Sequence, residues 1–397
     1  MSANTDPKAI DEVLSRGVEE IVVEKALREK MQSGRVLRVK HGVDPTTSDL
    51  HLGHAVNYEK LRQFQELGHK IVFLIGSFTA RFGDPTDKSE TRKMRDKKEV
   101  EAMAKNYIGQ LGRLLDISKL EIRYNGEWYD QMNAEELLHL MSEFTVARML
   151  ERDMFQERIK EGRGIGLHEP VYPVLQGYDS VMLESDLTVV GRDQKFNELQ
   201  ARPLQETRGQ KPQDVVCMPL LVGTDGKKKM SQSLGNYVAL NDDPKDKYGK
   251  IMSLPDELIF DYFTLLTRLS LKEIEELKQE LKQGKNPRDC KMRLGREIVQ
   301  IYDGLSAAQE AERCFVSVVQ NKEKPEEIEE YKLKESLNLV DVLVNAGMVD
   351  SKSAARRLIE QGGVKVNDQK VEDVNLIIKP EGQVIQAGKR KFVKIVD

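Results

Sequence analysis

A strand–helix–strand pattern between residues 36 and 75 constrains the fold of this chain more than any other feature. A strand is predicted at residues 36–39, a helix begins near His51, and residues 71–75 form an apolar run typical of a strand buried on both faces. Parallel strands joined by a helix cross over in the right-handed sense. The pattern therefore predicts an α/β, Rossmann-like domain with a parallel sheet.

Two histidines, His51 and His54, lie in the first turn of that predicted helix, with Gly53 between them. At positions i and i+3 they share one face, where unpaired backbone N–H groups and the helix dipole favour an anion such as phosphate. Gly53 would let a flat ring such as adenine approach the backbone. Surface histidines or a metal site are the alternatives for this pair.

A second polar stretch, residues 227–233, contains three lysines followed by Ser231 and Ser233. It comes after a predicted strand at residues 215–222 and a glycine-containing turn. A run of lysines is usually a solvated surface. At a strand end of an open α/β sheet, however, it lies where such sheets bind ligands. Together the two stretches favour a site that binds a triphosphate.

The two stretches resemble the HIGH and KMSKS signatures of class I aminoacyl-tRNA synthetases. Across essentially the whole chain, the sequence resembles the bacterial-type tyrosyl-tRNA synthetases. The resemblance implies an enzyme that joins tyrosine to ATP, releases pyrophosphate and passes tyrosine to the 3′-terminal adenosine of tyrosine tRNA. It implies Mg²⁺ together with the ATP phosphates, and neither an organic cofactor nor a metal held by the protein.

Adenylate formation requires positioning and charge stabilisation on the leaving phosphates more than covalent chemistry from the protein. The candidates for this catalytic role are His51, His54, Lys229, Ser231 and Ser233, and the resemblance adds Lys88 and Arg92. The expected ATP-binding residues are Gly42, Asp44, Thr46, Gly53, Gly191, Asp193, Lys229 and Met230.

A predicted helix carries Tyr172, Gln176 and Asp179 on one face. Without further context such a helix would be half core and half surface. A site for a phenol hydroxyl needs a buried acceptor, which would be left unpaired if phenylalanine entered. The resemblance assigns the phenol to Asp179 and the substrate amino group to Tyr172 and Gln176. It also places Asp84 and Gln194 in the tyrosine site.

Four positions depart from the family pattern. Lys40 stands where many relatives have a tyrosine that meets the substrate phenol, and Gln232 replaces a lysine of the second signature. Val190 and Arg192 replace a glycine and a small residue. Lys40, Arg192 and Gln232 motivate a second hypothesis, a catalytically inactive RNA-binding paralogue. A third is a tryptophan-specific relative, against which Asp179 and the RNA-binding tail argue.

Composition adds few constraints on function. The 397 residues carry a net charge of −4, so no global basic field indicates nucleic acid. Three widely spaced cysteines fit a reducing cytosol rather than a disulfide framework. The first 34 residues contain no apolar run that would serve as a signal peptide or membrane span. We therefore expect a cytoplasmic protein that does not bind membranes.

The pattern of predicted elements indicates several domains. We expect an N-terminal helix and the catalytic domain at residues 1–238, with an insertion at about 119–186 that by resemblance contributes to a homodimer contact. Residues 239–321 look like a helical anticodon-binding domain, and residues 322–335 read as a linker. Residues 336–397 resemble a small α+β RNA-binding module first described in a ribosomal protein.

The C-terminal module has ten basic and eight acidic residues, a balance of only +2. RNA binding is therefore implied by the resemblance rather than by charge. Phosphate contacts there would fix orientation rather than read sequence. The expected contacts come from Lys352, Arg356, Arg357, Lys365, Lys389, Arg390 and Lys391.

Overall fold

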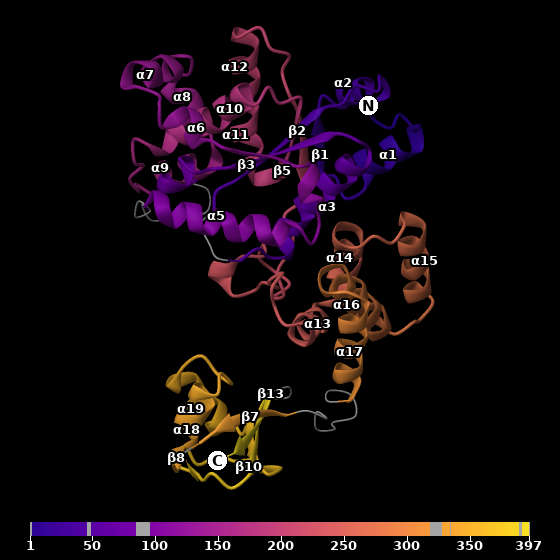
Figure 1. Ribbon diagram of the computed structural model, residues 1–397, viewed down its shortest axis with the longest axis vertical. Helices are drawn as coiled ribbons and strands as arrows, with labels where there is room; N and C mark the ends of the chain where they lie inside the picture. Colours follow the sequence, from indigo (N-terminus) through magenta and orange to yellow (C-terminus); the bar gives the residue numbers. More distant parts are fainter. Residues whose placement is uncertain are drawn as a thin grey trace. The chain divides into compact units, whose positions relative to one another are not determined.

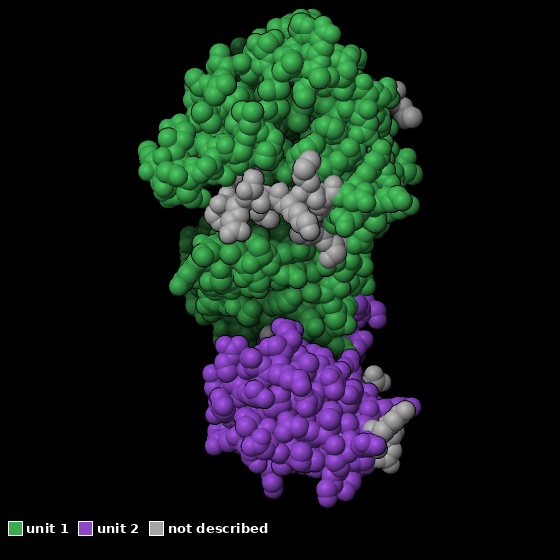
Figure 2. All heavy atoms as spheres, turned by 90° about the vertical axis from the view of Figure 1, so that its left-hand side faces the viewer, with its two compact units in different colours: residues 1–305 green, residues 306–397 purple. Residues whose placement is uncertain are grey.

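The structure is a computed structural model of the chain. It describes residues 2–45, 49–84, 96–317, 328–333, 335–388 and 391–396. The chain divides into two compact units, residues 1–305 and residues 306–397 (Figures 1 and 2). Each unit contains its own hydrophobic core.

A six-stranded sheet lies at the centre of the first unit (Figure 1). Its order is β1-β6-β5-β2-β3-β4, and its pairings are parallel except for the antiparallel edge between β1 and β6. The strands are β1 (Glu20–Val22), β2 (Arg38–Val43), β3 (Lys70–Ile75), β4 (Glu121–Tyr124), β5 (Leu187–Gly191) and β6 (Asp214–Met218). The predicted α/β fold with a parallel sheet is confirmed.

Helices follow most of these strands. Those of the N-terminal region and the sheet are α1 (Pro7–Ser15), α2 (Glu24–Gln32), α3 (Leu52–Glu66), α4 (Thr79–Phe82), α5 (Lys97–Leu111), α10 (Tyr172–Met182), α11 (Lys195–Leu199) and α12 (Ala201–Thr207). Between β4 and α10 lie α6 (Gly126–Tyr129), α7 (Ala134–Ser142), α8 (Val146–Met149) and α9 (Asp153–Lys160). After the sheet come α13 (Pro244–Met252), α14 (Ile259–Leu266), α15 (Leu271–Lys282) and α16 (Pro287–Asp303), and α17 (Leu305–Phe315) crosses the division between the units.

Strand β3 is covered on both faces, as its apolar run predicts. Ile71, Phe73 and Ile75 belong to the core that includes the buried side chains of α3. Val72 and Leu74 belong to a second cluster, together with side chains of α6 and α10. This alternation follows from the two-residue period of a strand.

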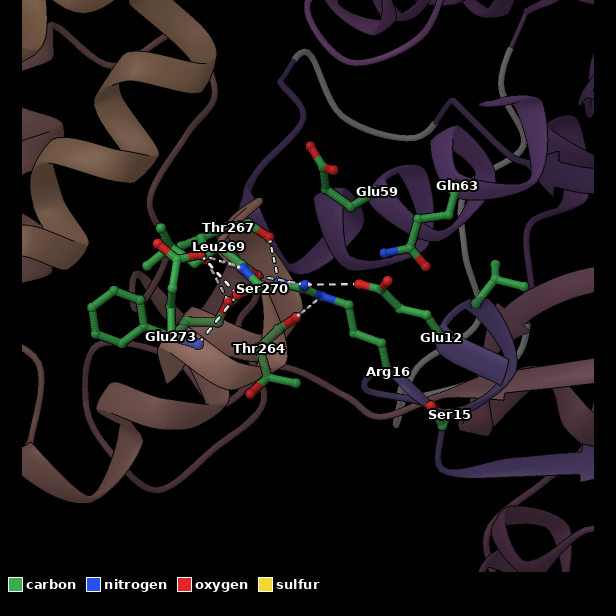
Figure 3. A network of polar contacts seen from close by, with 12 residues as sticks. Glu12, Ser15, Arg16, Glu59, Gln63, Thr264, Thr267, Leu269, Ser270 and Glu273 are labelled. Atoms are coloured by element: carbon green, nitrogen blue, oxygen red, sulfur yellow. Dashed lines mark hydrogen bonds and ion pairs between the residues drawn. The ribbon is translucent and has the colours of Figure 1, made fainter. Parts of the chain in front are cut away.

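Arg16, directly after α1, links the N-terminal segment to the helical region of the first unit (Figure 3). Its guanidinium donates hydrogen bonds to the carbonyl oxygens of Thr264 (3.1 Å), Thr267 (2.7 Å) and Leu269 (2.6 Å). These groups lie at and beyond the C-terminal end of α14, where carbonyls lack partners within the helix and a cation is favourable. The buried Arg16 therefore joins α1 to α14 within one compact unit.

The second unit is a small α+β module. Its larger sheet has the order β10-β9-β12-β13-β7, and β8 pairs with β11. Its elements are β7 (Glu329–Lys332), β8 (Leu337–Asn338), α18 (Leu339–Asn345), α19 (Lys352–Glu360), β9 (Val364–Val366), β10 (Gln369–Val371), β11 (Ile377–Ile378), β12 (Val384–Ala387) and β13 (Lys391–Val396). Its two helices and its strands agree with the small α+β module expected at residues 336–397.

Strand β7 corrects the linker expected at residues 322–335. Its four residues, Glu-Glu-Tyr-Lys, have no apolar alternation, so the sequence gives no strand signal there. Parallel pairing with β13 makes this segment a strand. The linker is therefore shorter at its C-terminal end than expected.

Candidate active site

A cleft of about 620 Å³ opens at the carboxyl ends of β2 and β5. The strand order reverses between these two neighbours, and such a reversal leaves a crevice for ligands. Every described residue expected in the catalytic, tyrosine-binding or ATP-binding sets lines this cleft: Gly42, Asp44, His51, Gly53, His54, Asp84, Tyr172, Gln176, Asp179, Gly191, Asp193, Gln194, Lys229, Met230, Ser231 and Ser233. The expected Thr46, Lys88 and Arg92 lie outside the described residues.

The two histidines use one ring nitrogen each to build the start of α3. His51 Nδ1 accepts a hydrogen bond from the Gly53 amide (3.1 Å), and His54 Nδ1 accepts one from the His51 amide (3.2 Å). Burial lowers the pKa of His51 to about 4, and burial together with His51 lowers the pKa of His54. Both rings are therefore neutral at pH 7, with the proton on Nε2.

This arrangement corrects the expected backbone anion site at the helix start. The Leu52 amide donates to the Val238 carbonyl (3.0 Å), and the Gly53 and His54 amides are bonded to His51. Because these first N–H groups already have partners, an anion there would meet the imidazole Nε2–H donors instead. The sequence could not reveal this, since Val238 comes from a distant segment.

Gly53 is required by close packing. A Cβ at this position would lie 2.9 Å from the His51 ring and 3.6 Å from Met230 Cβ. The first distance is below a normal contact, so any side chain would displace the His51 ring. The glycine thus lets the histidine pair and the lysine loop approach each other.

The lysine loop, residues 227–236, is held by Asn236. Its Nδ2 donates to the Lys229 carbonyl (3.1 Å) and to Asp225 (3.1 Å), while its Oδ1 accepts from the Ser231 amide (2.9 Å). Burial lowers the pKa of the half-buried Lys229, whose ammonium lies 3.7 Å from Asp193 Oδ2. The loop therefore presents Lys229 to the cleft.

Asp179 is a buried acceptor in the cleft wall. Its Oδ1 accepts from the indole Nε1–H of Trp128 (3.0 Å), and its Oδ2 accepts from Asn125 Nδ2 (3.3 Å). Burial raises its pKa to about 7, opposed most strongly by the charge of Lys40. Sequence reasoning missed Trp128 and Asn125, because nothing local connects residues more than 50 positions away to Asp179.

Three further carboxylates border the cleft, those of Asp44, Asp84 and Asp193. Asp44 accepts hydrogen bonds from the Tyr172 hydroxyl (2.9 Å) and the Thr79 hydroxyl (2.7 Å). Asp84 accepts one from Gln194 Nε2 (2.7 Å). Burial raises the pKa of Asp193, and the negative charge of Asp84 adds to the effect. The arrangement combines acidic groups with amide side chains, which suits a ligand carrying an ammonium group and several hydroxyls.

A family model described as tRNA synthetases class I (W and Y) matches residues 31–320. The chain belongs to this family. It is 47% identical to the tyrosine–tRNA ligase of Thermotoga maritima over 391 residues, 98% of each chain. It is 48% identical to that of Carboxydothermus hydrogenoformans over 398 residues, 97% of each chain. An S4 domain model matches residues 337–385.

Solved structures share the fold of this class I synthetase. A C-terminally truncated mitochondrial tyrosyl-tRNA synthetase from Coccidioides posadasii superposes with a TM-score of 0.64 at 24% identity, covering 77% of this chain and 91% of that one. The tyrosyl-tRNA synthetase from Archaeoglobus fulgidus gives 0.61 at 24% identity, covering 77% and 100%. The tryptophanyl-tRNA synthetase from Plasmodium falciparum gives 0.58. The fold alone therefore does not distinguish the amino acid.

The structure shows how this class I synthetase accommodates its unusual residues. Arg192 is largely exposed and donates to Glu19 (2.6 Å), so its bulk does not line the cleft. Gln232 donates to the Asp49 carbonyl (2.7 Å) and ties the lysine loop to the segment before α3. Val190 and Lys40 line the cleft.

Among the residues with described positions, no group of three or more His, Cys, Asp or Glu side chains is arranged to hold a metal ion.

In the S4 domain, Arg356 and Arg357 on α19 and Lys365 on β9 are exposed. Lys352 pairs with Asp341 (2.7 Å). Lys391 donates to the carbonyls of Gly347 and Met348. The expected Lys389 and Arg390 lie outside the described residues.

Proposed function

We propose that the protein is a tyrosine–tRNA ligase. It activates tyrosine with ATP to tyrosyl-adenylate and pyrophosphate, then transfers tyrosine to the 3′-terminal adenosine of tyrosine tRNA. The observation that carries the proposal is the buried Asp179 carboxylate in a cleft that also contains His51, His54 and the lysine loop. Relatives named tyrosine–tRNA ligase that match nearly the whole chain support it.

Asp179 binds the phenol hydroxyl of the substrate in this proposal. The carboxylate oxygens accept hydrogen bonds from Trp128 and Asn125, and a carboxylate has about four lone-pair sites, so one remains for the phenol O–H. A phenylalanine ring would remove water from this buried acceptor without replacing its hydrogen bond. The pocket would therefore reject phenylalanine by leaving Asp179 unpaired.

In this proposal, the substrate ammonium group contacts a second set of acceptors, separate from Asp179: Asp84, Tyr172, Gln176 and Gln194. All four line the cleft, and Asp84 is bonded to Gln194. A cationic ammonium is complementary to a carboxylate and amide oxygens.

ATP occupies the part of the cleft beside α3 and the lysine loop. Its adenosine portion contacts residues at the strand ends and the start of α3: Gly42, Asp44, Thr46, Gly53, Gly191, Asp193 and Met230. Asp193 accepts hydrogen bonds from the ribose hydroxyls. The Lys229 ammonium lies 3.7 Å from Asp193 Oδ2, which supports a ribose beside Asp193 and phosphates beside Lys229.

The tyrosine carboxylate attacks the α-phosphate, and the bond to the leaving pyrophosphate breaks. Negative charge grows on the leaving phosphates, so donors that meet it there stabilise the transition state. His51 and His54 donate through neutral Nε2–H groups, and Lys229 supplies a positive charge. Ser231, Ser233, Lys88 and Arg92 complete the set of donors. Mg²⁺ is held by the ATP phosphates and water.

The 3′-terminal adenosine of the transfer RNA enters the cleft to receive tyrosine, and the rest of the transfer RNA binds outside it. The proposal assigns residues 1–238 to catalysis and the helices within residues 239–321 to the anticodon. The S4 domain contacts phosphates through its basic side chains: Lys352, Arg356, Arg357, Lys365, Lys389, Arg390 and Lys391. The exposed arginines of α19 and Lys365 on β9 support this assignment.

The helices between β4 and α10 form a homodimer contact in this proposal. Four large apolar side chains are strongly exposed there: Leu138 (64%), Val146 (71%), Ile159 (49%) and Leu167 (89%). Exposed apolar groups concentrated in one segment favour burial against a partner. We also place the enzyme in the cytoplasm, which agrees with its free cysteines. No described helix is long and apolar enough to span a membrane.

Exchange of labelled pyrophosphate into ATP tests the proposal, with tyrosine, phenylalanine and tryptophan supplied separately in the presence of Mg²⁺. We expect exchange with tyrosine alone. Exchange with tryptophan would indicate the tryptophan-specific relative. No exchange with any amino acid, from a folded protein, would indicate the inactive RNA-binding paralogue.

A further inference from the structure

Lys40 forms a buried ion pair in the floor of the amino acid site. It lies on β2, is 1% exposed and lines the cleft. Its ammonium lies 2.9 Å from Glu198 Oε2 and donates to Ser180 Oγ (2.6 Å) and the Gln176 carbonyl (3.3 Å). All three ammonium hydrogens therefore have partners, and the cation is both paired and hydrogen-bonded.

Glu198, on α11, completes the pair from a fully buried position. Its Oε2 also accepts from Gln213 Nε2 (3.0 Å), and its Oε1 accepts from Gln176 Nε2 (2.7 Å). An ionised carboxylate can only accept hydrogen bonds. The amide nitrogen of Gln176 must therefore face Glu198, and the amide oxygen must face the other way.

The same argument fixes the orientation of the neighbouring amide group, that of Gln194. Gln194 Nε2 faces the Asp84 carboxylate, so Gln194 Oε1 points away from it. Asn197 Nδ2 donates to both amide oxygens, to Gln176 Oε1 at 2.9 Å and to Gln194 Oε1 at 3.0 Å. The two oxygens therefore converge on one donor, and each keeps a lone pair.

We propose that Lys40 and Glu198 are positioning residues that fix the Gln176 amide, so that the oxygens of Gln176 and Gln194 accept hydrogen bonds from the substrate ammonium. Lys40 pairs with the Glu198 carboxylate, and Glu198 in turn accepts the hydrogen bond that orients the Gln176 amide. This assignment rests on the proposed function, because it needs an amino acid in the cleft. Many relatives have a tyrosine at this position that contacts the substrate phenol. Lys40 instead acts on the ammonium end of the substrate, through Glu198 and Gln176.

Two tyrosine analogues separate this role from a purely structural one. Tyramine keeps the phenol and the ammonium, whereas 3-(4-hydroxyphenyl)propionate keeps the phenol and the carboxylate. Because both analogues carry the phenol, any effect of Lys40 on Asp179 changes both dissociation constants alike. The ratio of the two constants therefore reports on the ammonium site. Trp128, the chain's one tryptophan, lies 3.0 Å from Asp179, and its fluorescence measures binding without turnover.

The first variant is Glu198→Gln, whose amide can turn either way and no longer sets Gln176. It also leaves the Lys40 cation unpaired, so a second variant, Lys40→Met/Glu198→Gln, removes both charges together. In both, we expect the dissociation constant for tyramine to rise by about tenfold, the effect of one charge-assisted hydrogen bond. The dissociation constant for 3-(4-hydroxyphenyl)propionate should stay within about twofold of its wild-type value.

A matched control removes a second ion pair, that of the buried Lys247 with the partly buried Asp303, by Lys247→Met/Asp303→Asn. These residues do not line the cleft, so this variant should keep the wild-type ratio. Equal weakening of both analogues in the Glu198 variants, or an unchanged ratio, would overturn the positioning role. Failure of wild-type exchange with tyrosine would instead overturn the proposed function, because the analogue ratio is measured without catalysis.

Discussion

Replacement of Asp179 by asparagine tests the phenol contact with a minimal change in shape. The aspartate accepts from Trp128 and Asn125, one donor on each oxygen. An asparagine keeps one of these contacts and turns its own NH₂ group toward the other donor. The variant therefore loses a charged acceptor, and its NH₂ group faces the N–H donor of Trp128 or Asn125 with no acceptor between them. A hydrogen bond to a charged group contributes about 1.5–3 kcal/mol, which corresponds to roughly a tenfold to hundredfold loss in kcat/KM for tyrosine.

The pH dependence of tyrosine binding provides a second readout of the same group. Burial raises the pKa of Asp179 to about 7, against the opposing charge of Lys40. The carboxyl of the free protein therefore gains its charge as the pH rises through about 7. The ionised form is the stronger acceptor, so tyrosine affinity should rise between about pH 6 and about pH 8 and then level off. The asparagine variant should lose this dependence.

Pyrophosphate exchange at varied tyrosine and ATP, with a fluorescence titration of tyrosine at each pH, measures both effects. Asp193→Asn is the matched control, and it should raise the KM for ATP more than that for tyrosine. Equal losses for tyrosine and ATP in the Asp179 variant would refute the phenol role. So would the same pH dependence in wild type and variant.

Two further predictions concern the Arg16 hydrogen bonds and the lysine loop. Arg16→Met should lower the free energy of unfolding by about 2–4 kcal/mol, because three backbone carbonyls lose a charged, largely buried donor. Arg28→Met, which removes two ion pairs that are more exposed, with Asp11 and Glu24, should cost less than about 1 kcal/mol. Urea titration measures both losses, and equal losses would contradict the role of the Arg16 hydrogen bonds. Gln232→Lys should leave tyrosine affinity unchanged and raise the exchange rate, because lysine keeps a donor for the Asp49 carbonyl and adds a positive charge. A slower exchange would mean that the loop depends on the glutamine amide.

Much of the fold could be predicted because its signals are local. The apolar run of β3 indicated a strand covered on both faces, and both faces are buried. The signatures at His51 and Lys229 indicated one ligand site, and the structure brings them to one cleft. Strand β7 escaped prediction, because its charged residues become a strand only through pairing with β13.

The sequence by itself indicated which side chains gather in the cleft, through the motifs at His51 and Lys229 and through the resemblance to a known family, which added residues such as Asp84 and Gln194. The tertiary structure alone decided how those side chains are oriented and charged. The partners of Asp179 lie more than 50 residues away, and Lys40 meets Glu198 from 158 positions away. Hydrogen bonds and burial between such distant segments set the amide orientations and the pKa values, and no local pattern encodes them.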